Sequence, residues 1–201
     1  MTTTSNAWRG NPELRKLTRV QEILFTPEEC DMIFTHFPKR PFDTGLTARM
    51  DKGEYEIIPS FSNRLETKLD LNDHINHELF GDSGRVAKDF LKEKFSKWID
   101  GDLDQWAKVI RYGVGDFLRS HIDSGEGDIL SRRDWTLIIQ LSDSDEYEGG
   151  DVVIGDWIMP REKGFTCLFN GGYVPHEITK VTSGERKSFI TWFSNQDLTF
   201  I

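Results

Sequence analysis

Four residues in the second half of the chain have types and a spacing that could do chemistry. His121 and Asp123 form a His-x-Asp pair, His176 follows the first histidine by 55 residues, and Arg186 lies ten residues further on. Two imidazoles and one carboxylate can occupy one face of an octahedral Fe(II) ion and leave the opposite face open for a cosubstrate and dioxygen. An arginine at a suitable distance can bind the far carboxylate of a keto-diacid through two parallel hydrogen bonds. The four residues therefore predict an iron-dependent oxidation.

The His-x-Asp pair is a weak signal when it is taken alone. Chance supplies roughly half of one such pair in a chain of this composition, and the alternative is a solvated turn with an incidental histidine. The run RYGVGDFLRSHIDS favours a metal site, because it places the pair at the end of a predicted strand, where residues two apart point to the same side. The side chains of His121 and Asp123 can then enter one interior.

His176 and Arg186 depend on the fold to reach that pair. A lone histidine is more often structural than a ligand, but a two-sheet β fold brings distant strands together, so a third ligand is expected from far along the chain. Arg186 enters the apolar run 187–193, where its burial would be unfavourable unless it met an anion. The alternative is an arginine at a strand edge that reaches solvent.

Other polar residues carry weaker signals. Tyr112, nine residues before His121, can point inward from the preceding strand and offer its hydroxyl to the cosubstrate, although a packing tyrosine is nearly as good an interpretation. His36, His74 and His77 are interpreted as surface or packing residues; the last two are spaced to share a metal, but no third ligand is evident. The acidic turn 143–148 and the Gly-Gly pair that follows it are assigned no chemistry.

The composition bounds the class of protein. The chain has 201 residues, of which 37% are hydrophobic, and it includes fourteen Phe and six Trp, enough for the core of one compact domain. A net charge of -9 gives a surface that repels phosphate backbones, so no nucleic-acid partner is expected. Cys30 and Cys167 form no CxxC pattern and predict neither a disulfide framework nor a zinc site. No signal peptide and no membrane span is evident, so a cytoplasmic location is expected.

Hydrophobic periodicity divides the chain into two halves. Residues 1 to about 18 are expected to form a loose arm, and residues 19–201 a single domain that is helical to about residue 101. Residues 26–29 (Thr-Pro-Glu-Glu) predict a helix start with a capping box, and Pro38 predicts its end. Residues 39–63 are expected to form strands around a mobile loop, and helical spacing returns from about Leu65, ending near Gly101.

The second half changes to the period of β-strands. Short strands are predicted at residues 106–111, 117–121, 135–141, 151–154, 165–169 and 187–193. Helices followed by strands indicate an α+β domain in which helices pack against one sheet of a jelly roll, with the metal site in residues 105–194. Within the loop of residues 39–63, Arg49, Lys52 and Gly53 are hypothesised to belong to a lid over the substrate.

Three segments of the second half resemble the Fe(II)/2-oxoglutarate-dependent dioxygenases, in particular the small bacterial and viral members of the prolyl 4-hydroxylase-like branch. The segments are RYGVGDFLRSHID, WTLIIQLSDSDEYEGGDVVI and GFTCLFNGGYVPHEITKVTSGERKSFITWF. The resemblance implies a double-stranded β-helix in which His121, Asp123 and His176 ligate iron. It also implies that Arg186 binds the C5 carboxylate of 2-oxoglutarate and that Tyr112 contacts this cosubstrate, with ascorbate as the reductant.

Two positions depart from the pattern of that family. Collagen-type members have a lysine where this chain has Arg186, so the chain is more similar to the oxygen-sensing and bacterial subgroup. A strand position that often holds an aromatic residue beside the cosubstrate is Gln140 here. Gln140 and Ser188 are both candidates for contact with the cosubstrate.

The resemblance implies hydroxylation of a prolyl residue in a peptide or protein, as in procollagen-proline 4-dioxygenases, with release of succinate and CO2. Halogenating relatives lack the carboxylate that Asp123 supplies, so hydroxylation is favoured. A free amino acid or another small molecule is an alternative substrate for the same centre. Repair of alkylated nucleic acids is disfavoured, because those relatives usually carry a second arginine where this chain has Trp192. A non-catalytic jelly-roll binding module is the alternative of a different class, and the oligomeric state is left open.

Overall fold

Two antiparallel sheets form the body of the computed structural model. It describes residues 18–38, 43–44, 48–51, 54–57, 62–69, 71, 74–77, 81–96, 98–101, 107–125, 133–194 and 198–200. In the order of their pairing, the larger sheet contains β1 (Thr18–Ile23), β16 (Phe165–Phe169), β12 (Trp135–Gln140), β19 (Arg186–Phe193), β10 (Lys108–Tyr112), β6 (Leu65–Lys68) and β2 (Asp43–Thr44). The smaller sheet contains β15 (Trp157–Ile158), β14 (Val152–Ile154), β17 (His176–Ile178), β11 (Phe117–His121) and β5 (Ser62–Asn63).

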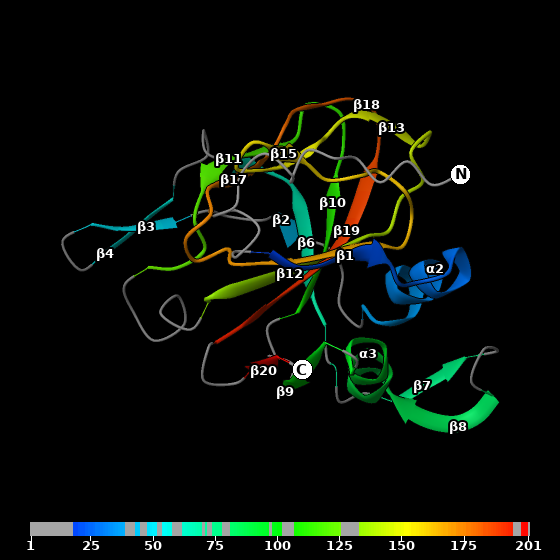
Figure 1. Ribbon diagram of the computed structural model, residues 1–201. Helices are drawn as coiled ribbons and strands as arrows, with labels where there is room; N and C mark the ends of the chain where they lie inside the picture. Colours follow the sequence, from blue (N-terminus) through cyan, green and yellow to red (C-terminus); the bar gives the residue numbers. More distant parts are fainter. Residues whose placement is uncertain are drawn as a thin grey trace.

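Four two-stranded ribbons accompany these sheets. They are β13 (Tyr147–Gly149) with β18 (Val181–Gly184), β20 (Leu198–Phe200) with β9 (Ile99–Gly101), β3 (Ala48–Asp51) with β4 (Glu54–Ile57), and β7 (His74–His77) with β8 (Gly81–Val86). The β13–β18 ribbon lies at the end of the larger sheet where β19 begins (Figure 1). Strand β19 begins with Arg186, so the ribbon lies near this residue.

Helix α2 (Pro27–His36) begins where the sequence predicts it. The backbone N–H of Glu29 donates to Thr26 Oγ1 over 3.3 Å, and the N–H of Thr26 donates to Glu29 Oε2 over 2.9 Å, which completes the capping box. The helix ends just before Pro38, which cannot continue it. The second helix, α3 (Ala87–Phe95), has no side-chain cap and carries Lys92 and Lys94 in its last turn, where cations are favoured by the helix dipole.

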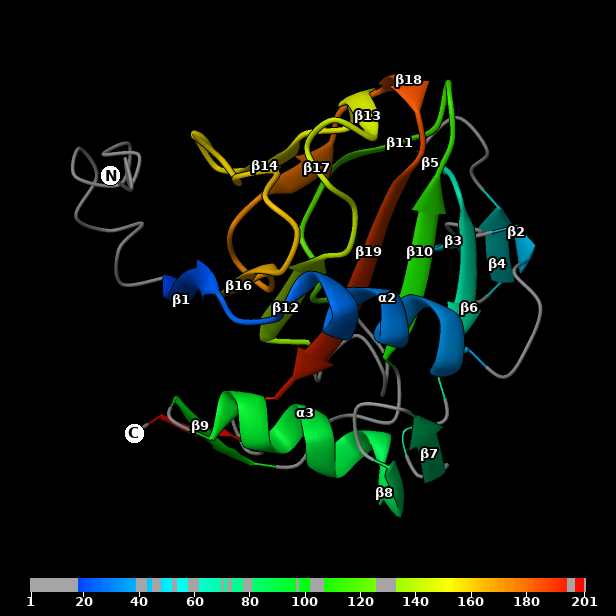
Figure 2. The same ribbon diagram turned by 90° about the vertical axis from the view of Figure 1, so that its right-hand side faces the viewer.

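Both helices pack on one face of the larger sheet (Figure 2). All six residues of β12 are buried, so both faces of the larger sheet are covered at this strand. Its side chains point alternately to the two faces. Leu137 and Ile139 join a core with Ile33 of α2 and Leu91 of α3. Ile138 points the other way, into a second core with residues of the smaller sheet. Each such side chain contributes about 1.5–3 kcal/mol when it is fully buried, so the larger sheet is held from both sides.

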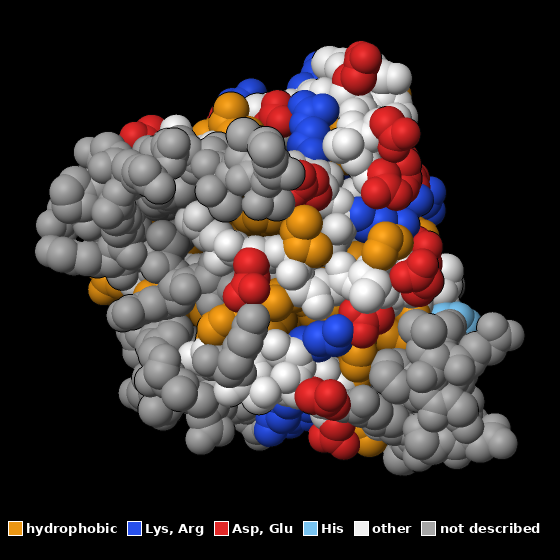
Figure 3. Space-filling model, turned by 45° about the vertical axis from the view of Figure 1, so that its right-hand side comes forward, with side chains coloured by type: hydrophobic (Ala, Val, Ile, Leu, Met, Phe, Trp, Pro, Cys, Tyr) orange, Lys and Arg blue, Asp and Glu red, His pale blue; other side chains and the backbone are white. Residues whose placement is uncertain are grey.

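Ion pairs connect the helices to their surroundings at the surface. Lys94 of α3 lies 2.7 Å from Glu29 Oε2, and Lys163 lies 2.8 Å from Asp31 Oδ1 of α2. Figure 3 shows acidic and basic side chains interspersed on one described face of the molecule. Exposed pairs of this kind contribute only about 0–1 kcal/mol each, so apolar packing positions the helices. Within the described residues, no helix combines the length and the apolar character needed to cross a membrane.

The first half contains more strand than the sequence predicts. The expectation of helical spacing from Leu65 is wrong there, because β6 forms a strand that pairs with β10 in the register Lys68 to Lys108. Pairing with β10 satisfies backbone N–H and C=O groups of β6 that a helix would bond internally. This tertiary pairing overrides the local preference of the sequence. Strands within residues 39–63 are confirmed as β2, β3, β4 and β5. Residues 1–17, predicted as a loose arm, lie outside the described residues.

Candidate metal centre

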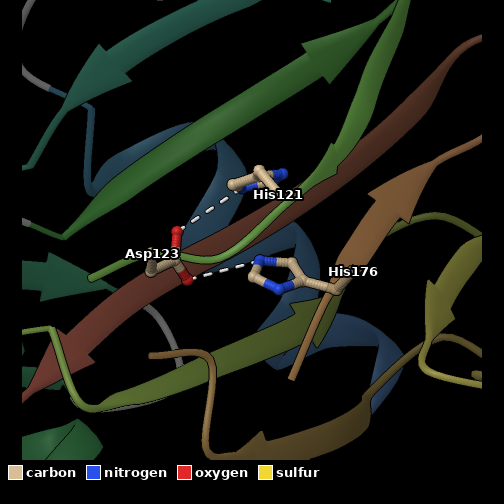
Figure 4. Close-up of side chains that lie close together, drawn as sticks. All are labelled: His121, Asp123 and His176. Carbon is tan, nitrogen blue, oxygen red and sulfur yellow. Dashed lines mark ion pairs between the residues drawn. The ribbon is translucent and has the colours of Figure 1, made fainter. Parts of the chain in front are cut away.

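The three predicted ligands meet between the two sheets (Figure 4). His121 ends β11, Asp123 follows two residues later, and His176 opens β17. Strands β11 and β17 are neighbours, and His121 pairs with His176 in their register. One atom from each of the three side chains lies within 4.8 Å of the others. The fold therefore brings together residues that are far apart in sequence, as the spacing predicts.

Both imidazoles are oriented by the backbone. Nδ1 of His121 lies 2.9 Å from the carbonyl oxygen of Arg119, and Nδ1 of His176 lies 3.0 Å from that of Val174. An Nδ1–H group that donates to a carbonyl leaves the lone pair of Nε2 free for a ligand. The Nε2 atoms face the carboxylate of Asp123, at 3.5 Å from Oδ1 for His121 and 3.3 Å from Oδ2 for His176.

Asp123 is fixed by contacts that the sequence does not reveal. Its backbone N–H donates to the carbonyl of Gly171 over 2.8 Å, and Thr136 Oγ1 donates to its Oδ2. A Cβ atom on Gly171 would overlap Thr136 Oγ1 and lie 2.8 Å from Asp123 Oδ2. Gly171 is therefore required by the close approach of its backbone to the carboxylate. Thr136 could have been suspected only from its place on the same face of a predicted strand as Gln140.

The electrostatics of the triad favour an ionised carboxylate at Asp123. Burial alone would raise the pKa of Asp123, but hydrogen bonds with His121 and then His176 outweigh it and hold the pKa well below its usual range. Burial would lower the pKa of His176, yet the hydrogen bond with Asp123 outweighs it and raises that pKa. A divalent cation can replace these shared protons, since two neutral imidazole nitrogens and one carboxylate are ligands that Fe(II) accepts. The residues present therefore fit a metal.

Arg186 lies in the interior, as an anion-binding residue would. It is 1% exposed, so the alternative of a strand-edge arginine reaching solvent is excluded. Its Nη2 donates to Gln140 Oε1 over 3.1 Å and its Nη1 to Ser188 Oγ over 3.4 Å. Its Nε has no hydrogen-bond partner, and the described part of the chain provides no carboxylate in an ion pair with it. A buried cation held only by neutral groups is unfavourable until an anion joins it.

Tyr112 lies directly beneath this guanidinium. Strands β10 and β19 pair Tyr112 with Arg186, and the guanidinium carbon lies 5.4 Å from the centre of the tyrosine ring. The tyrosine is buried, and burial raises the pKa of its hydroxyl. Ser188 and Gln140 are opposite each other on β19 and β12. The structure thus brings together the four side chains predicted to contact the cosubstrate, which are Arg186, Tyr112, Gln140 and Ser188.

Two contributors were missed in the segment that had been assigned no chemistry. Gln140 Nε2 donates to the hydroxyl of Tyr147 over 2.6 Å. Gly150, at a φ of +63°, approaches Arg186 so closely that a Cβ atom would lie 3.3 Å from the arginine Cδ and 2.9 Å from Val181 Cγ2. The tyrosine two residues before a Gly-Gly pair was the available signal, because paired glycines mark places where the backbone approaches another group. We call Arg186, Gln140, Ser188, Tyr112 and Tyr147 the arginine cluster.

The remaining candidates lie elsewhere or outside the described residues. Arg49 belongs to β3, but its side chain is not among those described, and Lys52 lies outside the described residues, so the lid stays a prediction. His36 is exposed at the end of α2. His74 and His77 belong to the strand β7 rather than to a helix.

The second half of the chain is similar to known oxygenases. Residues 107–194 match the model of the 2OG-Fe(II) oxygenase superfamily. A PKHD-type hydroxylase from Caulobacter sp. (strain K31) is 30% identical over 95 residues, which are 42% of this chain and 41% of that relative. The chain therefore matches less than half of the length of this relative.

Solved structures share the fold at low sequence identity. A prolyl-4-hydroxylase from Pseudomonas putida superposes with a TM-score of 0.54 and 17% identity, covering 90% of this chain and 95% of its own. The viral collagen prolyl hydroxylase from Paramecium Bursaria Chlorella virus-1 gives a TM-score of 0.50 and 17% identity, covering 86% and 92%. The resemblance predicted from the sequence is confirmed, and the segment that matches the family model contains His121, Asp123, His176 and Arg186.

Proposed function

We propose that this protein is an Fe(II)- and 2-oxoglutarate-dependent dioxygenase that hydroxylates a C–H bond. One observation carries the proposal: β12 connects a metal-binding triad to a buried arginine that lacks an anion among the described residues. Thr136 contacts Asp123 at one end of this strand, and Gln140 contacts Arg186 at the other. Four residues of strand span roughly 13 Å between α-carbons. The arrangement suits a ligand that chelates a metal with one end and offers a carboxylate to Arg186 with the other.

Each group has a defined task in this proposal. When bound, Fe(II) and 2-oxoglutarate supply an oxidative decarboxylation that yields succinate and CO2 and transfers one oxygen atom of dioxygen to a substrate C–H bond. His121, Asp123 and His176 hold the metal on one face, and backbone carbonyls keep both imidazoles oriented. Arg186 anchors the far carboxylate. The apolar core around Ile138, Phe169 and Ile178 keeps water from the centre.

The proposed substrate is a prolyl residue in a peptide or protein. The support is the resemblance to the prolyl 4-hydroxylase-like branch, together with a fold shared with two prolyl hydroxylases. A free amino acid or another small molecule is the alternative, because substrate contacts are usually made by loops that vary between enzymes of one fold. The iron centre serves both substrates equally.

Turnover with peptides tests the proposal. The protein is incubated with Fe(II), ascorbate, 2-oxoglutarate and a library of proline-rich peptides, and both succinate and peptide mass are measured. We expect succinate and a mass gain of one oxygen atom on a proline-containing peptide. Oxidation of only a proline-free small molecule would select the alternative substrate. If no succinate formed with any substrate, and Asp123→Ala behaved as the wild type, a non-catalytic binding module would replace the proposal.

A further inference from the structure

The hydroxyl of Tyr147 is buried beside Arg186 and has a proton without a recorded acceptor in the described part of the chain. Tyr147 begins β13, which pairs with β18 in the register Tyr147 to Gly184. The β13–β18 ribbon lies near the start of β19 (Figure 2). The side chains of Tyr147 and Arg186 both lie 3.3 Å from the position that a Cβ atom of Gly150 would occupy. Tyr147 is only 3% exposed. Its hydroxyl therefore faces the arginine cluster rather than solvent.

The hydrogen bonds of Gln140 determine the orientation of that hydroxyl. Arg186 can only donate, so the oxygen of the Gln140 amide must face Nη2 of Arg186, at 3.1 Å. The amide nitrogen then faces Tyr147 and donates to its hydroxyl oxygen over 2.6 Å. A phenol oxygen that accepts from Gln140 in this way must direct its own proton toward another group.

The phenol keeps this proton at neutral pH. Burial raises the pKa of Tyr147, and the nearby cations Arg186 and Arg161 only partly oppose this effect. The guanidinium carbon of Arg161 lies 5.1 Å from the centre of the Tyr147 ring. Gln140 thus holds both the Tyr147 hydroxyl and the guanidinium of Arg186, and Arg186 keeps an unfilled donor at its Nε. Donors on two neighbouring side chains can bind the two oxygens of one carboxylate.

We propose that Tyr147 donates a hydrogen bond to the carboxylate that Arg186 anchors, and that Gln140 is the positioning residue that aligns both donors. This inference rests on the proposed function and extends it: Tyr147 makes the site selective for a 2-oxo diacid over a 2-oxo monoacid. Pyruvate can chelate the metal in the same way as 2-oxoglutarate, but it has no second carboxylate for Tyr147 and Arg186 to bind.

Binding of the two oxo acids to the Fe(II)-loaded protein tests this selectivity without turnover. Under anaerobic conditions, chelation of ferrous iron by a 2-oxo acid produces a charge-transfer absorption that can be titrated. In Tyr147→Phe, we expect the Kd for 2-oxoglutarate to rise roughly tenfold or more, as for loss of one hydrogen bond to a charged group. The Kd for pyruvate should stay within twofold of the wild-type value. Tyr173→Phe, at a tyrosine that is 70% exposed, is the matched control and should change neither.

Each outcome is decisive. An unchanged Kd for 2-oxoglutarate in Tyr147→Phe would overturn the inference while leaving the proposed function intact. An equal weakening of both oxo acids would also overturn it, because that result indicates general damage to the site. If the wild type bound neither acid, the proposed function itself would fail. Should Tyr147→Phe fold poorly because Gln140 Nε2 loses its acceptor, the comparison is made in a Gln140→Met background. There the double variant must bind 2-oxoglutarate more weakly than Gln140→Met alone, with pyruvate unchanged between the two, and equal Kd values for 2-oxoglutarate would overturn the inference.

Discussion

The two ends of β12 build their sites in different ways. At the metal end, backbone atoms hold the ligands: both imidazoles bond to carbonyls two residues earlier, and the N–H of Asp123 bonds to the carbonyl of Gly171. At the arginine end, side chains hold side chains, since Arg186 contacts Gln140 and Gln140 contacts Tyr147. A site fixed mainly by the backbone is less sensitive to changes in neighbouring side chains than a site fixed by side chains. In the proposed function, the metal end supplies the chemistry and the arginine end the selectivity for the cosubstrate.

The largest effect is expected from removing the carboxylate at the metal end. Asp123→Ala deletes one of three ligands and the hydrogen-bond partner of both imidazoles, so succinate formation should fall to the background without enzyme. Succinate release and bound iron per chain are the measurements. Asp156→Ala, at an exposed aspartate in the turn between β14 and β15, is the control and should keep full activity. Substantial turnover by Asp123→Ala would remove the triad from the mechanism.

The next effect separates the two ends. Arg186→Lys keeps a charge but loses the planar fork that binds a carboxylate through two hydrogen bonds. We expect the Kd for 2-oxoglutarate to rise about a hundredfold, whereas the affinity for Fe(II) should stay within twofold. Both are measured by anaerobic titration. An equal loss of iron affinity would show that the two ends are not independent.

A pair of glycine substitutions sharpens the same contrast. In Gly171→Ala the new methyl group would overlap Thr136 Oγ1 and crowd Asp123, so the affinity for iron should fall at least tenfold. The affinities for pyruvate and for 2-oxoglutarate should fall by equal factors. In Gly150→Ala the methyl group meets Val181 and the stem of Arg186 at a positive φ, at a cost of about 1–3 kcal/mol in unfolding free energy. Its iron affinity should be retained and its affinity for 2-oxoglutarate reduced. Urea unfolding and the titrations with Fe(II) and with 2-oxoglutarate distinguish the two variants. If both variants lost the same affinities, the metal end and the arginine end would not be independent.

The smallest effect concerns the support of Asp123. Thr136→Val removes the hydroxyl that donates to Oδ2, and loss of such a supporting hydrogen bond typically weakens metal binding about tenfold or somewhat more. Thr191→Val is the matched control, because Thr191 is also buried in the larger sheet but its hydroxyl has no recorded partner among the described residues. Iron affinity from competition with a chelator is the measurement. Equal effects in the two variants would mean that Thr136 only fills space.

The metal end was predictable from sequence because its signal is local. His-x-Asp at the end of a strand places two ligands on one side, and the strands Phe117–His121 and Phe165–Phe169 lie within the predicted bounds. The capping box of α2 is also encoded in four adjacent residues. Arg186 was predictable for a related reason, since a charge in an apolar strand must find a partner.

The arginine end was only partly predictable because its contacts depend on register. Gln140 meets Arg186 across strands that are distant in sequence, and it meets Tyr147 only because the chain turns back after β12. No local pattern specifies which residues will face each other. The ribbon of β13 and β18 consists of strands of three and four residues, too short to show a period. Strand β6 was missed for the same reason, since its pairing with β10 rather than its own sequence makes it a strand.

An anaerobic titration of the protein with Fe(II) in the presence of 2-oxoglutarate tests the metal triad most directly. We expect a charge-transfer absorption that saturates at one iron per chain, disappears in Asp123→Ala, and needs much more 2-oxoglutarate in Arg186→Lys. Absence of this absorption in the wild type, or its full retention in Asp123→Ala, would contradict the claim that His121, Asp123 and His176 bind the metal that 2-oxoglutarate chelates.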